Sequence, residues 1–161
     1  MKNPVIISIL TVTLLACQEK QYFTSSPEID LIKRQQEAYL KGDWATLRSF
    51  YHDTATIYAN TWGHGKLSPD QLTERQRKGV EDYSEYALAK DGVYELLIND
   101  RGEYWVHNWT EWRGVHKNGK EVRVVVNISF RVANNKIVFA GFIYDTLPLV
   151  MAAQSGTQSS M

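Results

Sequence analysis

A regular alternation of apolar and polar side chains predicts antiparallel strands over residues 103–146. In the middle stretch, Glu121–Val132, the even positions hold Val, Val, Val, Ile, Phe and Val, while the odd positions are mostly polar. A period of two sustained over such a length is the pattern of a strand with one buried face. The turn sequences Asn118-Gly119 and Asn134-Asn135 divide the segment into a three-stranded meander.

Helix start signals dominate the chain before residue 83. Ser25 and Glu28 have the spacing of a capping box, and Asp43 predicts the start of a second, shorter helix. Ser68-Pro69-Asp70-Gln71 repeats the start signal for a third helix. A short strand is expected at Ala55–Asn60 and a further strand-like stretch at Tyr83–Ile98. This order predicts an α+β fold, with helices against one face of a bent antiparallel sheet.

The two turns also predict which side chains share a face of the meander. If both are two-residue hairpin loops, Trp105 pairs with Val132 and His107 with Phe130. The inner face is then mostly large and apolar, but it is interrupted by ionisable residues. Its predicted members are Trp105, His107, Trp109, Glu111, Val126, Ile128, Phe130, Val132, Ile137, Phe139, Gly141, Ile143 and Asp145. The opposite face mixes polar and aromatic residues and is predicted to be a homodimer contact.

Ionisable groups on an otherwise apolar face are candidates for a functional pocket, because burial shifts their pKa values or forces them to find partners. His107 and Asp145 are the candidate catalytic residues. Each has a structural alternative: His107 as a core histidine with a satisfied ring, and Asp145 as a cap where the chain leaves the sheet. Glu111 could equally be solvated at the end of the sheet. The candidate ligand-binding residues are Tyr58, Trp62, His64, Trp105, Trp109 and Glu111.

Composition narrows the classes of function. The 161 residues suit one domain, and 18 basic against 18 acidic residues give no basic surface for nucleic acid. The histidines lack metal-ligand spacing, so no metal site is predicted. The chain also has no phosphate loop and no dinucleotide fingerprint, so we expect no cofactor.

The N-terminus has the form of a secretory signal, with Lys2 before the apolar run Val5–Ala16. It ends at Cys17, the chain's single cysteine, in a sequence that resembles the lipobox of bacterial lipoproteins. An ordinary secretory signal is the alternative. Lipidation at Cys17 would anchor the protein to a membrane of the cell envelope. Gln18, in place of an aspartate, favours the outer membrane.

The predicted domain organisation follows from these boundaries. A signal peptide covers 1–16, a lipidated cysteine and polar tether 17–27, the folded domain 28–153, and a disordered tail 154–161. Four stretches of the domain are informative together: Ala38–Trp44, Phe50–Ala55, Trp105–Gly114 and Gly141–Asp145. In these residues the domain resembles the nuclear transport factor 2 superfamily, in its SnoaL-like branch.

The resemblance implies a cone-shaped domain, in which a curved sheet wraps round the N-terminal helices and encloses a pocket. Relatives with this shape include lyases and isomerases that need no cofactor, and many pair through the outer face of the sheet. Three functions therefore stay open. The domain could bind a small hydrophobic molecule in an aromatic-lined pocket, catalyse a proton transfer, or serve as a structural dimerisation module. Whether it is an enzyme is left undecided by the sequence.

Overall fold

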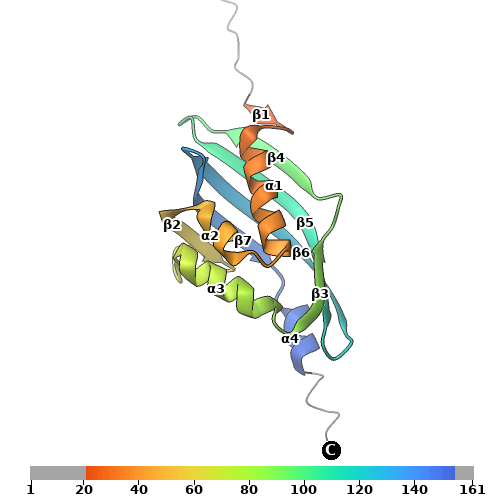
Figure 1. Ribbon diagram of the computed structural model, residues 1–161. Helices are drawn as coiled ribbons and strands as arrows, with labels where there is room; N and C mark the ends of the chain where they lie inside the picture. Colours follow the sequence, from red (N-terminus) through yellow and green to blue (C-terminus); the bar gives the residue numbers. More distant parts are fainter. Residues whose placement is uncertain (1–20, 155–161) are drawn as a thin grey trace, which may run out of the picture.

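The computed structural model describes residues 21–154, in which a curved mixed sheet wraps round helices (Figure 1). The helices α1, α2 and α3 lie against the inner face of the sheet, and α4 follows the last strand. In chain order the elements are β1 (Tyr22–Phe23), α1 (Pro27–Leu40), α2 (Trp44–Ser49), β2 (Tyr51–Ala59), α3 (Pro69–Val80), β3 (Tyr83–Leu88), β4 (Val93–Ile98), β5 (Tyr104–His116), β6 (Glu121–Ala133), β7 (Lys136–Tyr144) and α4 (Leu147–Gln154). The predicted α+β cone is therefore confirmed.

The helix starts follow the capping signals of the sequence. The side chain of Asp43 accepts a hydrogen bond from Thr46 N at 3.1 Å and begins α2. Ser68 and Gln71 form the full capping box of α3, with bonds of 3.2 and 2.8 Å between each side chain and the other's backbone N–H. The first helix begins one residue later than predicted, because Ser26 is its N-cap.

The sheet has the order β1-β4-β5-β6-β7-β2, and β3 pairs with β5 alongside β4. Most pairs are antiparallel, but β2 and β7 are parallel. The two-residue strand β1 pairs with β4, so the ordered fold begins before residue 28. Within the described residues, no helix has the length and apolar character needed to span a membrane.

The register of β5 differs from the prediction by one residue. His116 N donates to Lys120 O at 2.8 Å, which leaves a three-residue loop whose last residue, Gly119, has φ of +87°. Only glycine adopts that conformation without strain, and it marks the three-residue type of hairpin. Trp105 consequently pairs with Arg131, not Val132. A shift of one residue moves every side chain of β5 to the opposite face.

A second shift occurs in β7. The Asn134-Asn135 turn has the predicted two residues, both with positive φ, and Val132 pairs with Ile137 as expected. A bulge then places Arg131 opposite Phe139, which reverses the faces for the rest of the strand. The face assignments that are wrong for these two reasons are Trp105, His107, Trp109, Glu111, Phe139, Gly141 and Ile143, and Asp145 lies beyond the end of β7.

The core lies between α1 and the inner face of the sheet. Ile29 and Ile32 of α1 are fully buried against strands that contribute Val106 and Phe130. A smaller cluster beside α4 contains Trp112 and Val122. Between these two clusters the inner face is not completely filled, and this gap is the candidate site.

Candidate functional site: a cavity between α1, α3 and the sheet

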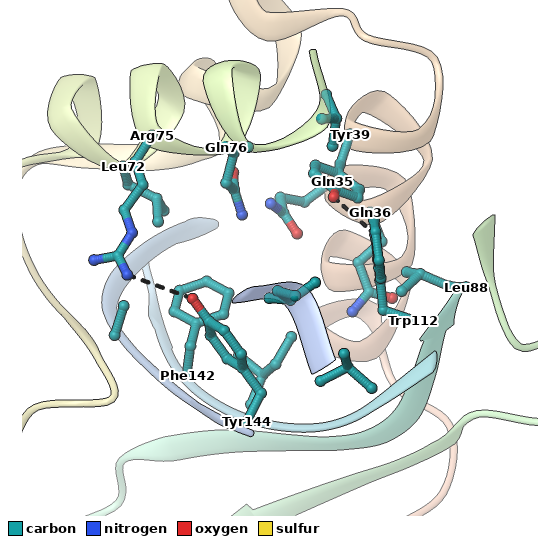
Figure 2. Close-up of a pocket in the computed structure, with 16 residues that line it drawn as sticks. Gln35, Gln36, Tyr39, Leu72, Arg75, Gln76, Leu88, Trp112, Phe142 and Tyr144 are labelled. Carbon is teal, nitrogen blue, oxygen red and sulfur yellow. Dashed lines mark hydrogen bonds between the residues drawn. The ribbon is translucent and has the colours of Figure 1, made fainter. Parts of the chain in front are cut away.

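A cavity of about 250 Å³ lies at this gap (Figure 2). This volume is close to the lower end for small-molecule sites. Its walls are mostly apolar, and the polar groups among them come from α1, α3 and the ends of two strands. The lining residues are Gln35, Gln36, Tyr39, Ala59, Leu72, Arg75, Gln76, Gly79, Val80, Leu88, Trp112, Val124, Ile128, Phe142, Tyr144 and Leu149.

The first helix supplies three polar side chains on the stripe that faces the sheet. Gln36 and Tyr39 follow Ile32 at helical spacing, so one helix face carries both the core and the cavity wall. Gln35 and Gln36 are almost fully buried. Buried amides are tolerated only when they are hydrogen-bonded, so their partners decide how rigid this wall is.

A chain of hydrogen bonds fixes Gln36. Its Nε2 donates to Oδ1 of Asn108 at 2.8 Å, and Asn108 Nδ2 donates to the carbonyl oxygen of Val93 at 3.1 Å. The hydroxyl of Tyr94 donates to Gln36 Oε1. These bonds link α1 to β4 and β5 through the completely buried Asn108. The wall on this side is therefore preorganised rather than adaptable.

Tyr39 presents a hydroxyl to the cavity from the same helix. Trp112 Nε1 donates to this oxygen at 3.0 Å, across the cavity wall (Figure 2). Burial raises the pKa of Tyr39 well above its ordinary value, although the bond from Trp112 acts in the opposite direction. The hydroxyl stays protonated at neutral pH, so it can donate its hydrogen to a ligand oxygen.

The third helix and the end of β7 form the other side of the cavity. Arg75 reaches from α3 towards the hydroxyl of Tyr144, with Nη2 at 3.5 Å from that oxygen (Figure 2). Gln76 points into the cavity one residue further along, and its buried Oε1 has no hydrogen-bond partner. Asn60 Oδ1 accepts from Tyr144 N at 2.9 Å, which fixes the backbone at this point.

Most polar groups of the lining are uncharged donors and acceptors. None of the described residues that line the cavity is Asp, Glu, His, Lys, Cys or Ser, and Arg75 is the charged one among them. Amides, phenols and an indole can orient a ligand and polarise a carbonyl. They do not abstract protons readily near neutral pH, because their pKa values lie far from it.

The two predicted catalytic residues lie outside this cavity and apart from each other. His107 is on the outer face of β5, half-buried, with Nδ1 2.9 Å from Ser129 Oγ. Burial lowers its pKa, and Glu95 on the neighbouring strand opposes part of that effect. Asp145 is exposed beyond β7, where its Oδ1 accepts from Leu147 N at 2.9 Å. The placement of these two residues on the inner face is therefore wrong, and Asp145 caps the chain's exit into α4.

The six predicted ligand-binding residues also lie away from the cavity. Tyr58, Trp62, Trp105 and Phe139 form a cluster of rings on the outer face, with centroid separations of 5.4–6.1 Å. Trp109 is 53% exposed on the same face. Glu111 lies beside Arg113 and Arg123, and His64 is exposed in the loop after β2.

Metal binding finds no support in the described part of the chain. No group of three or more His, Cys, Asp or Glu side chains in residues 21–154 could hold a metal ion. Cys17 and the predicted signal peptide and tail lie outside the described residues, so their roles stay predictions.

The cavity residues were not among the predicted site residues, yet one signal for them was present. Gln36 and Tyr39 interrupt the apolar stripe of α1, and polar residues on a buried stripe need partners inside the fold. Arg75 and Gln76 carry no such signal, because the whole of α3 is rich in polar residues.

Comparison with known proteins supports the fold rather than a specific activity. No protein-family model matches the chain, and no curated protein does. Solved structures do match. IdmH from Streptomyces antibioticus, a proposed polyketide cyclase, is similar with a TM-score of 0.62 and 20% identity, over 81% of this chain and 99% of that chain.

Two further structures agree. A protein with a ketosteroid isomerase-like fold from Catenulispora acidiphila, solved in complex with trimethylamine, has a TM-score of 0.61 and 14% identity, over 82% of this chain and 95% of that one. A SnoaL-like protein from Shewanella putrefaciens has a TM-score of 0.55 and 16% identity, over 83% and 89%. The chain therefore shares the fold of the nuclear transport factor 2-like and SnoaL-like proteins.

Proposed function

We propose that this protein binds a small, mainly apolar molecule in the cavity between α1, α3 and the sheet. The observation that carries the proposal is the lining itself. Apolar walls are combined with a few converging polar groups that are held in place by their own hydrogen bonds, as at Gln36 and Tyr39. That combination is typical of small-molecule sites. The related folds solved with a small molecule or proposed as polyketide cyclases also support it.

Filling the cavity tests this proposal. Val124 lines the cavity, whereas its neighbour Val125 is 69% exposed on the outer face of the same strand. We expect 4-phenylbutan-1-ol to bind the full chain and the variant Val125→Trp in isothermal titration calorimetry, and binding to Val124→Trp to be lost. Ala59→Phe fills the cavity from β2 and provides an independent test if Val124→Trp does not fold. Unchanged binding to folded Val124→Trp and Ala59→Phe proteins would reject the cavity as the site.

A proton-transfer enzyme, such as a cyclase or isomerase, is the second candidate. One observation favours it: the buried Tyr39 hydroxyl, oriented by Trp112, could stabilise negative charge on a carbonyl oxygen. The test uses NMR to monitor how fast the hydrogens on the carbon next to the carbonyl of a cyclic ketone exchange for deuterium. Exchange accelerated by the protein and slowed by Tyr39→Phe would support catalysis, and exchange at the rate of buffer alone would oppose it.

We also propose that the protein is a lipoprotein of the bacterial envelope. The support comes from the sequence, where Cys17 ends a short apolar segment. Gln18 favours the outer membrane as the destination. Replacing Cys17 by Ala should move the protein from the detergent phase to the aqueous phase in phase partitioning. If the variant partitions as the parent does, the anchor is not at Cys17.

A homodimer through the outer face of the sheet completes the proposal. Val93, Trp109 and Ile143 are more than half exposed and lie in one row across the sheet, in which Asn127 is the residue from β6. Exposed apolar side chains gathered on one face are typical of protein contacts. Light scattering should give a dimeric mass that Ile143→Lys halves, whereas Val150→Lys, on α4, leaves it unchanged. A monomeric parent protein would contradict the dimer.

A further inference from the structure

The cations of α3 differ in how their charge is neutralised. Arg77 pairs with Glu74 at 2.8 Å and with Glu81 at 2.5 Å, and Lys78 lies 3.3 Å from Glu74. Arg75 has no carboxylate partner among the described residues. These side chains follow one another closely along the same helix, so the difference reflects the direction in which each one points.

The cation without a carboxylate is the one that lines the cavity. Elsewhere in residues 21–154, Arg34 is the other arginine without a carboxylate partner, and its guanidinium lies over the ring of Phe50. Arg75 instead extends towards Tyr144, whose hydroxyl is its hydrogen-bond partner in the described chain. A guanidinium stays charged at any physiological pH, and its planar set of donors matches the two oxygens of a carboxylate.

The surroundings of Arg75 favour an anion with an apolar body. No acidic residue is among those that line the cavity, so a ligand carboxylate would meet no like charge there. The hydroxyl of Tyr144 can supply a second donor beside the guanidinium. Leu72, Val80 and Phe142 provide apolar wall on the neighbouring surface.

We infer that the ligand is a small carboxylic acid with an apolar body, whose carboxylate pairs with Arg75 and the hydroxyl of Tyr144. The apolar body lies against the inner face of the sheet. This inference rests on the proposed function, because it assumes that the cavity holds a ligand. It adds the charge of the ligand and the residue that recognises that charge.

A pair of probes that differ only in the head group tests the inference. 4-Phenylbutanoate and 4-phenylbutan-1-ol share their apolar body, and their dissociation constants can be compared by calorimetry with the full chain. We expect the acid to bind about tenfold more tightly, because charge-assisted hydrogen bonds are stronger than neutral ones, although Arg75 is exposed to solvent, which screens its charge. In Arg75→Gln this preference should disappear, because the acid binds more weakly while the affinity for the alcohol is unchanged.

Arg77→Gln is the matched control, because it removes the same charge from the same helix away from the cavity. It should keep the preference for the acid, and Tyr144→Phe should reduce it partially. Equal affinity for acid and alcohol in the parent protein, or a preference that survives Arg75→Gln, would overturn the inference while leaving the cavity as a binding site. Failure of both probes to bind would instead contradict the proposed function itself.

Discussion

The two faces of strand β5 carry different kinds of polar side chain. On the inner face Asn108 is completely buried and bonded to neighbouring amide and carbonyl groups, and Trp112 donates to a phenol. On the outer face Glu111 lies beside arginines, and His107 is only half-buried. Amides and phenols can be buried once they are hydrogen-bonded, whereas burying charges costs far more. The part of the cavity wall that β5 supplies is therefore uncharged, and His107 and Glu111 lie on the opposite face of the strand.

Glycine positions on the two faces give the largest test of this difference. A Cβ at Gly114, on the inner face, would lie 2.4 Å from Trp112 and 2.6 Å from Tyr83. We expect Gly114→Ala to lower the free energy of unfolding by about 2–3 kcal/mol, because both rings must move. At Gly141, on the outer face, the nearest contact would be 3.4 Å, so Gly141→Ala should change it by less than about 1 kcal/mol. Urea denaturation measures both, and equal effects would contradict the difference between the faces.

Neighbouring polar residues provide the next test. Asn108→Ala removes the partner of both Gln36 and the Val93 carbonyl, and we expect a loss of about 2 kcal/mol in the free energy of unfolding. His107→Ala, one residue away on the outer face, should cost less than about 1 kcal/mol, since its contact with Ser129 is partly solvated. Chemical denaturation would measure both variants. A larger effect at His107 than at Asn108 would reverse our description of the faces.

The smallest expected effect is the pH dependence that His107 contributes. Its pKa is lowered from 6.5, first by burial. The unfolded chain therefore binds a proton more readily, and the contribution to stability is complete above about pH 6.5 and declines as pH falls towards the lower folded pKa. We expect less than about 1 kcal/mol, because the ring is half-exposed.

The measurement compares denaturation at pH 5 and pH 7.5 for the parent protein and His107→Gln. Acid also protonates carboxylates, so the informative quantity is the difference between the two proteins. His107→Gln should show the weaker pH dependence. The same pH dependence in both proteins would show that His107 contributes nothing.

Local signals predicted the elements well. Capping residues at Asp43 and Ser68 and the alternation of β6 depend on neighbours within a few residues, and each is found where expected. The faces of β5 and β7 depend on a single residue in a loop and on one bulge. The sequence Asn118-Gly119 suits two hairpin lengths, and hydrogen bonds at His116 and Lys120 select the longer one.

The candidate site was harder to predict for the same reason. An error of one residue placed His107 and Glu111 on the inner face, where they do not lie, and placed Asn108 and Trp112 on the outer face. The apolar stripe of α1 does not depend on strand register, so Gln36 and Tyr39 could have been recognised there. Arg75 becomes distinctive only through contacts in space, because its lack of an acidic partner is not visible in the order of residues.

The pairing of β1 with β4 limits the distance between the domain and a membrane to which Cys17 would be anchored. Ile98 N donates to Gln21 O at 2.9 Å, so the chain is held in the sheet four residues after Cys17. Those residues span at most roughly 14 Å, at about 3.5 Å each. A lipid on Cys17 would hold the β1 end of the domain beside the bilayer. The helix α4, whose Leu149 lines the cavity, lies at the opposite end of the domain (Figure 1), so this wall of the cavity would lie away from the bilayer.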